Sequence, residues 1–226
     1  MPRGARIFLA MLQGIWAIIF DFDGVLVDSE PLHEWAIREA VRPLGWTFST
    51  ERFFAEIVGR GDENAFRKIA EWNGERVEEE RVAAQLRVKW GLMAQGIEQE
   101  KFTVQPGAVE LIRAAKRRGL VAVCSGSVRE TVGTMLERIG VRDVLDALVC
   151  GDDVARMKPA PDGYLLAAKI LGVEPGACLA IEDTPTGIRA GKSAGMRVVG
   201  VCHTYPREKL HEADVVVERI GEIVLG

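Results

Sequence analysis

The sequence has no excess of positive charge. It holds 29 lysine and arginine residues against 33 aspartate and glutamate residues, which gives a formal net charge of −4. A general nucleic-acid-binding surface needs a basic face, so we expect no nucleic-acid partner. A small anionic substrate remains compatible with this balance, because the charge near a site matters more than the net charge.

The sequence also lacks a C-x-x-C pair, and this absence argues against a metal knuckle of the zinc-finger type. Its four cysteines are Cys124, Cys150, Cys178 and Cys202. Each lies in or beside an apolar run, so we expect small, buried core residues. This use of cysteine fits a reducing compartment, and we expect a cytoplasmic protein.

A hydrophobic run long enough to cross a bilayer is missing as well. The run IFLAMLQGIWAIIF follows Arg3 and Arg6 and resembles the start of a signal peptide, but no A-x-A site follows it. We expect no membrane partner. We predict that residues 15–20 form the first core strand. Residues 1–12 are then an extension, or a misassigned start with Met11 as the true one.

The spacing of apolar residues differs between two parts of the chain. Between residue 31 and about residue 96, apolar residues recur at helical spacing in four successive segments. From Pro106 on, short apolar strands alternate with helices, which are predicted over 107–118, 128–139, 162–171, 185–194 and at the end of the chain. This alternation predicts an α/β fold, in which a parallel sheet carries helices on both faces and a helical stretch is inserted after the first strand.

Polar residues stand where the predicted strands end. In open parallel sheets, ligands bind beyond the carboxyl ends of the strands, so these side chains are expected to meet at one edge. The residues concerned are Asp21, Asp23, Ser125, Lys158, Glu182 and Asp183.

Several carboxylates in one cleft repel one another unless a cation is present. Carboxylate oxygens without a histidine or cysteine cluster favour a hard ion, and Mg²⁺ is the expected cofactor. Because Mg²⁺ binds few carboxylates and often a substrate phosphate, the pattern predicts a phosphoryl substrate.

The D-x-D spacing of Asp21 and Asp23 points both side chains the same way on an extended chain. One of them can attack phosphorus as a nucleophile, and the other can exchange protons with the leaving oxygen and with water. Gly24 permits a tight turn after them. Lys158 precedes a proline and is expected to neutralise phosphate charge, while Ser125 and nearby N–H groups are expected to bind phosphoryl oxygens.

The segments DFDGVLVDSE, CSGS, KPAPD and IEDTPTGIRAG occur in this order at the predicted strand ends. Together they resemble the haloacid-dehalogenase-like superfamily of phosphotransferases, from about residue 15 onward. The chain is most similar to the branch of sugar-phosphate phosphatases and β-phosphoglucomutase-like enzymes. The resemblance implies a three-layer Rossmann-like core over 1–28 and 102–226, with a small four-helix cap domain inserted over 29–101.

The resemblance also implies roles for single residues. Asp21 would be the nucleophile that forms an aspartyl-phosphate, and Asp23 would be the general acid/base. Mg²⁺ would be held by Asp21, the Asp23 carbonyl and Asp183, with Glu182 as a further member of the metal site. The predicted phosphate-binding residues are Ser125, Gly126, Lys158 and Gly24.

The predicted substrate-binding residues are His33, Arg60 and Arg129. Phosphatases and mutases of this branch share the two aspartates, but a mutase must also hold a distal phosphate. The mutase branch places a basic–polar pair just after its S-x-S motif, whereas this chain has Val128 followed by Arg129. This departure favours hydrolysis.

The expected activity is therefore Mg²⁺-dependent hydrolysis of a small phosphorylated metabolite, a sugar phosphate being the best match for a small cap. The alternative is β-phosphoglucomutase-type transfer between sugar hydroxyls.

Phospho-receiver signalling domains also place acids, a hydroxyl and a lysine at strand ends. The acid/base candidate Asp23 and the helical insertion argue against that class. We expect a monomer.

Overall fold

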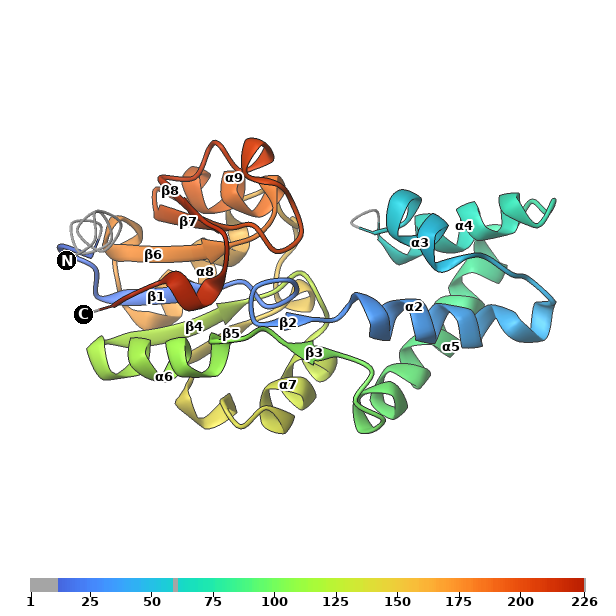
Figure 1. Cartoon of the computed structure of the whole chain (residues 1–226), viewed down its shortest axis with the longest axis horizontal. Helices are drawn as coiled ribbons and strands as arrows, with labels where there is room; N and C mark the ends of the chain where they lie inside the picture. The colour runs from blue at the N-terminus through green and yellow to red at the C-terminus, as the bar shows by residue number, and fades with distance from the viewer. Residues whose placement is uncertain (1–11, 59–60, 226) are drawn as a thin grey trace. The chain divides into compact units, whose positions relative to one another are not determined.

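The computed structural model describes residues 12–58 and 61–225. The chain divides into two compact units, with the divisions between Asp28 and Ser29 and between Thr103 and Val104. One unit is built around a parallel sheet, and the other is helical (Figure 1). The predicted assignment of the helical unit as a cap stays a prediction. The expectation about Met11 as the start falls outside the described residues.

The sheet domain contains six parallel strands in the order β5-β4-β1-β6-β7-β8. Strand β1 lies between β4 and β6, so the direction in which strands are added reverses at β1. Such a switch point opens a crevice at the carboxyl ends of the strands. The strands are β1 (Ala17–Phe20), β4 (Leu120–Cys124), β5 (Ala147–Val149), β6 (Cys178–Glu182), β7 (Arg197–Val201) and β8 (Val215–Val217).

The central strands are apolar because both of their faces are covered. Every residue of β1 and of β6 is buried. The one charged residue in these two strands is Glu182, at the end of β6. A strand buried on both faces reads as a continuous apolar run without alternation. The helices of this domain are α6 (Ala108–Arg118), α7 (Arg129–Arg138), α8 (Asp162–Leu171) and α9 (Pro185–Ser193).

Helices α8 and α9 contribute to one hydrophobic cluster with β1, β4, β5, β6 and β7. Tyr164 of α8 and Ile188 of α9 are fully buried members of this cluster. The start of α9 follows its prediction. Thr184 is the N-cap, its side chain accepts a hydrogen bond from the N–H of Gly187, and Pro185 opens the helix. This cap fixes where β6 ends and therefore where Asp183 lies.

The predicted helix at the end of the chain is wrong within the described residues. After β8 the chain forms only a 3₁₀ turn, η6 (Ile220–Glu222). Gly221 lies in this turn, and its backbone approaches Gly107 so closely that a Cβ at position 107 would lie 2.9 Å from the Gly221 Cα. A glycine in the middle of so short a segment disfavours an α-helix.

The helical unit contains α2 (Glu30–Val41), η1 (Arg42–Leu44), α3 (Thr50–Glu56), α4 (Asp62–Trp72) and α5 (Glu79–Glu98). Helices α2, α3, α4 and α5 bury their apolar faces in a core of their own, which includes Trp46, Phe53 and Phe66. The four predicted helical segments are thus present. The short strands β2 (Val27–Asp28) and β3 (Thr103–Val104) pair where the chain passes between the units. Among the described helices, none combines the length and the hydropathy needed to span a membrane.

Candidate active site

Asp21 follows directly after β1 and is almost fully buried. Its Oδ1 accepts a 2.6 Å hydrogen bond from Nζ of Lys158, which comes from the loop after β5. The pKa of Asp21 is raised to about 8, chiefly by burial and next by the nearby Glu182 carboxylate, while Lys158 acts in the opposite direction. One lysine is therefore not enough positive charge to keep Asp21 ionised at neutral pH.

Asp23 faces the residues that follow β4. Its Oδ2 accepts hydrogen bonds from Ser125 Oγ at 3.0 Å and from Ser127 Oγ at 2.8 Å. Ser125 Oγ in turn accepts a bond from the N–H of Ser127, so the two serines form a compact turn. The sequence predicted that Asp23 and Ser125 would lie together, but it did not single out Ser127.

Glu182 is the last residue of β6, and it is completely buried. Its Oε1 accepts hydrogen bonds from Lys158 Nζ at 2.6 Å and from the Tyr164 hydroxyl at 2.9 Å. Its Oε2 accepts bonds from the N–H groups of Asp183 and Thr184 and from the Thr184 hydroxyl. The carboxylate thus joins Lys158, α8 and the start of α9.

Asp183 is fully buried, and within the described part of the chain neither of its carboxylate oxygens accepts a hydrogen bond of normal geometry. Burial raises its pKa well above the ordinary value, and Asp21 and Glu182 raise it further; the neighbouring Thr204 hydroxyl lowers it too little to compensate. A buried carboxylate without a donor is costly. This group needs either a proton or a cation.

The residues present fit a magnesium ion. Asp21, Glu182 and Asp183 each offer a carboxylate oxygen, and these oxygens lie within 4.8 Å of one another. The donor set consists of hard oxygens, as Mg²⁺ prefers. Asp183 supplies the unpartnered oxygens, whereas both oxygens of Glu182 are already used by protein donors.

Gly24 is required beside this group. Its φ of +82° is one that side chains rarely adopt, and a Cβ at this position would collide with the Asp183 carboxylate and approach the Thr204 hydroxyl. The Gly24 carbonyl oxygen lies 2.8 Å from His203 Nδ1, and the Gln105 side-chain amide donates to the same oxygen at 3.3 Å.

His203 and Gln105 are contributors that the sequence reasoning missed in this role. The N–H of Ile220 donates to His203 Nε2 at 3.3 Å. Both contacts of His203 are satisfied together when Nδ1 carries the proton and donates to Gly24. No local motif marks Gln105, because its partner is distant in the sequence.

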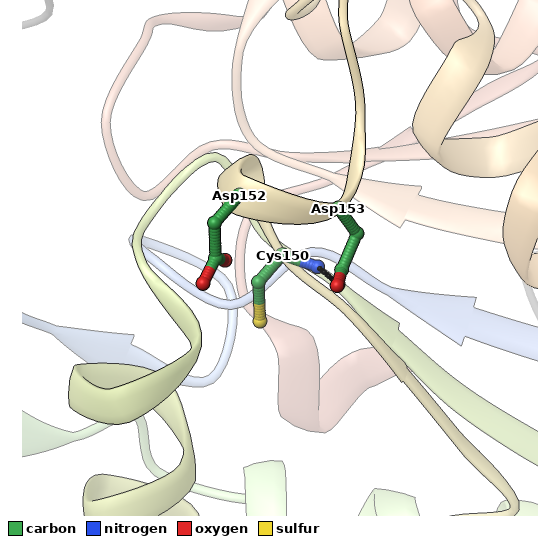
Figure 2. A group of neighbouring side chains, drawn as sticks. All are labelled: Cys150, Asp152 and Asp153. Carbon is green, nitrogen blue, oxygen red and sulfur yellow. Dashed lines mark hydrogen bonds between the residues drawn. The ribbon is translucent and has the colours of Figure 1, made fainter.

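A second acidic group surrounds the turn after β5. Cys150, Asp152 and Asp153 offer ligand atoms within 4.8 Å of one another (Figure 2). These acids already have local partners: Asp153 Oδ2 accepts from the N–H of Cys150 and from the Arg129 guanidinium, and Asp152 Oδ1 accepts from the N–H of Arg129. These hydrogen bonds connect the η3 turn (Gly151–Asp153) to the start of α7.

Arg129 was predicted to bind substrate, but its guanidinium already donates a hydrogen bond to Asp153. Its guanidinium also donates to the Leu148 carbonyl at 2.9 Å. Gly126, predicted to bind phosphate, lies between the serines of the turn, and its carbonyl is close to Gly151. Neither contact tests a role toward a ligand.

The helical unit holds the other predicted substrate-binding residues. His33 lies on α2, and its Nδ1 is 2.8 Å from Nζ of Lys89 on α5. Lys89 is buried and also donates to Asp62 Oδ2 at 2.5 Å. Arg60 lies outside the described residues.

A family model matches most of the chain, including the helical unit. The model described as "haloacid dehalogenase-like hydrolase" matches residues 15–195. The chain belongs to the haloacid dehalogenase-like hydrolase family. The matched range includes Asp21, Asp23, Ser125, Lys158, Glu182 and Asp183.

Individual relatives agree with this assignment. The protein CbbY of Rhodobacter capsulatus is 33% identical over 84% of this chain and 87% of its own length. Hexitol phosphatase A of Escherichia coli is 30% identical, over 92% of each chain. The crystal structure of β-phosphoglucomutase from Clostridium difficile superposes with a TM-score of 0.77 at 27% identity, covering 93% of this chain and 94% of that one. The α/β Rossmann-like fold of this haloacid dehalogenase-like hydrolase is thereby confirmed.

Proposed function

We propose that this hydrolase is a Mg²⁺-dependent phosphatase that acts on a small phosphorylated metabolite, with a sugar phosphate as the substrate class. The observation that carries the proposal is the meeting of Asp21, Lys158 and Asp183 at the carboxyl ends of β1 and β6. A buried carboxylate paired with one lysine and facing an unpartnered carboxylate suits a site for a cation and a phosphoryl group. The printed names of the relatives, among them a hexitol phosphatase, support the substrate class.

In this proposal Asp21 is the nucleophile. One of its oxygens is held by Lys158, which leaves the other to attack phosphorus and form an aspartyl-phosphate. Lys158 would keep Asp21 oriented and reduce the negative charge that builds up on the transferring group. The ester oxygen leaves as this bond forms.

Asp23 would act as the general acid/base. It would protonate the leaving oxygen and then take a proton from the water that cleaves the aspartyl-phosphate. The hydroxyls of Ser125 and Ser127 hold its carboxylate, which fixes its direction before substrate arrives. The products are the free alcohol and inorganic phosphate, and both aspartates return to their starting state.

Asp21, Asp183 and the Asp23 carbonyl would hold the magnesium ion, with Glu182 immediately behind them. When bound, Mg²⁺ would supply the positive charge that the buried carboxylates lack and would draw in the phosphoryl oxygens. Ser125, the N–H of Gly126 and Lys158 would bind those oxygens, and Gly24 would leave room for them.

The helical unit over about residues 29–101 would serve as the cap that selects the rest of the substrate. His33, Arg60 and Arg129 are the side chains proposed for that contact. The position of His33 beside the buried ammonium group of Lys89 supports its role in this contact. Arg129 can take part only if it gives up or shares its hydrogen bond to Asp153.

Transfer between sugar hydroxyls is the second candidate, because the superposed relative from Clostridium difficile is a β-phosphoglucomutase. Against it stands Val128, an exposed apolar residue at the N-cap of α7. Arg129, the one cation beside Val128 in this turn, is bonded to Asp153. We therefore favour water as the acceptor.

The test is phosphate release from a panel of sugar phosphates, polyol phosphates and nucleotides, with Mg²⁺ and with a chelator. We expect release from one or a few sugar or polyol phosphates, lost with the chelator and reduced by about 10⁴-fold or more in Asp21→Asn. Release that persists in Asp21→Asn, or a protein inactive on the whole panel, would overturn the proposal.

A further inference from the structure

Tyr164 is a fully buried polar residue to which the proposed mechanism gives no task. It lies on α8 and packs in the hydrophobic cluster beneath β1, β4 and β6. Its hydroxyl reaches out of this cluster and donates a 2.9 Å hydrogen bond to Glu182 Oε1. A phenylalanine would fill the same apolar space without a polar atom, so the hydroxyl needs an explanation other than packing.

The acceptor of this bond has no free direction. Glu182 Oε1 receives Tyr164 and Lys158, while Oε2 receives three donors from Asp183 and Thr184. A carboxylate offers about four lone-pair directions, so this one is saturated. Gly187 leaves the space for it, since a Cβ there would overlap the Glu182 carboxylate. The carboxylate is thus locked in one orientation.

Lys158 takes its position from this locked carboxylate. Its ammonium group donates to Asp21 Oδ1 and to Glu182 Oε1, both at 2.6 Å, and to the Cys124 carbonyl at 3.1 Å. Its Nζ also lies 5.1 Å from the centroid of the Tyr164 ring, within reach of a cation–π interaction. Tyr164 therefore contacts the lysine through its ring and orients the lysine's partner through its hydroxyl.

We propose that Tyr164 is a positioning residue, which acts through Glu182 to hold the Lys158 ammonium in line with Asp21. The inference rests on the proposed phosphatase activity and adds a residue outside the ligand-contacting set. Without the hydroxyl, Glu182 Oε1 keeps Lys158 as its one donor, so this oxygen is held less firmly opposite the lysine, although Oε2 keeps its three donors. The charge that Lys158 presents to the transferring phosphoryl group is then misplaced, although the substrate still binds.

The experiment compares Tyr164→Phe with the wild type on the best substrate of the panel. We expect kcat to fall about tenfold, in line with the loss of one hydrogen bond to a charged group, with KM changed less than about twofold. Tyr205→Phe is the matched control, because Tyr205 packs against the same cluster. We expect it to keep the wild-type kcat.

A double-mutant cycle separates positioning from a general loss of structure. In a Glu182→Gln background, Tyr164→Phe should lower kcat by less than about twofold, because the route from Tyr164 to Lys158 is already broken. A tenfold loss in both backgrounds, or a rise in KM without a fall in kcat, would overturn the inference.

Inhibition by orthovanadate and by inorganic phosphate gives a second readout that does not need the Glu182 variant. Tyr164→Phe should weaken inhibition by vanadate, which mimics the transition state, more than inhibition by phosphate. Equal changes would overturn the inference. A wild type that releases no phosphate would overturn the proposed function together with it, whereas an active wild type and an equally active Tyr164→Phe would overturn the inference alone.

Discussion

The absence of a side chain at Gly24 leaves room for the Asp183 carboxylate of the site. Gly24 has a φ of +82°, and a Cβ there would collide with Asp183. We predict that Gly24→Ala lowers kcat/KM by at least about 10²-fold, because the Asp183 carboxylate must move. Phosphate release and thermal unfolding should be measured together.

The matched control is Gly195→Ala. Gly195 has nearly the same φ, +81°, but among residues 12–58 and 61–225 no non-neighbouring heavy atom lies within 4 Å of a Cβ at that position. Both variants should lose about 1–2 kcal/mol of stability from backbone strain, Gly24→Ala should lose more because of the collision with Asp183, and only Gly24→Ala should lose activity. Equal activities in the two variants would contradict the role given to Gly24.

The buried carboxylates make stability depend on pH when no metal is bound. The pKa of Asp21 is about 8 in the folded chain, against 3.8 as its ordinary value. Between these values the folded state holds more protons than the unfolded state, so the free energy of unfolding falls as pH rises. Asp183, whose pKa is also raised, acts in the same direction.

We therefore predict that the metal-free protein melts at a lower temperature at pH 8 than at pH 5, by an amount equivalent to at most about 4 kcal/mol per group. Mg²⁺ should raise the melting temperature more at pH 8 than at pH 5. At pH 5 the carboxylates bind protons in the folded state, and the ion must displace these protons to bind. Asp21→Asn should flatten both trends. A melting temperature that rises with pH in the chelated wild type would contradict this account.

The residue types of the site were readable from the sequence, but their partners were not. Asp21, Asp23, Lys158 and Asp183 follow apolar strands, and parallel strands bring such positions to one edge. The bonds from Ser127 to Asp23 and from Tyr164 to Glu182 depend on side-chain directions that no local pattern encodes. The same holds for Arg129, whose pairing with Asp153 depends on the fold of the following turn.

At the scale of helices and strands, apolar spacing was sufficient in most places. The predicted helices 107–118, 162–171 and 185–194 match α6, α8 and α9 closely. The exception is the end of the chain, where an apolar-containing segment forms only a 3₁₀ turn around Gly221. There the backbone contact with Gly107 outweighs local periodicity.

The helical unit has its own buried ion pair, which joins α4 to α5. Lys89 is 1% exposed, and its partner Asp62 is 30% exposed. We predict that Lys89→Met lowers the free energy of unfolding by about 2–4 kcal/mol, because it leaves Asp62 without its counter-charge. Thermal and urea unfolding, followed by circular dichroism, would measure the change.

Lys68→Met is the control for this prediction. Lys68 pairs with Glu71 on the surface of the same unit, where both side chains are substantially exposed. An exposed pair contributes about 0–1 kcal/mol, so this variant should unfold close to the wild type. Equal destabilisation by the two variants would show that burial of the Lys89 pair is not what matters.

At the scale of the whole molecule, the two units divide the proposed task. The sheet domain carries the residues proposed for chemistry, all of which lie within residues 12–28 or after residue 104. The helical unit is inserted between β2 and β3, directly after the D-x-D segment. An insertion at this point can vary with the substrate while the strand ends stay unchanged, which is consistent with relatives that are named for different sugars and polyols.

The fate of the phosphoryl group decides between the two activities of this branch. The most direct measurement is a product balance in Mg²⁺, in which substrate consumed, free phosphate and isomerised sugar phosphate are counted in the same wells. β-Glucose 1-phosphate would be run, with a bisphosphate primer, beside the best panel substrate. The account predicts one free phosphate for each substrate molecule consumed. Glucose 6-phosphate formed without free phosphate, and only with the primer, would contradict it.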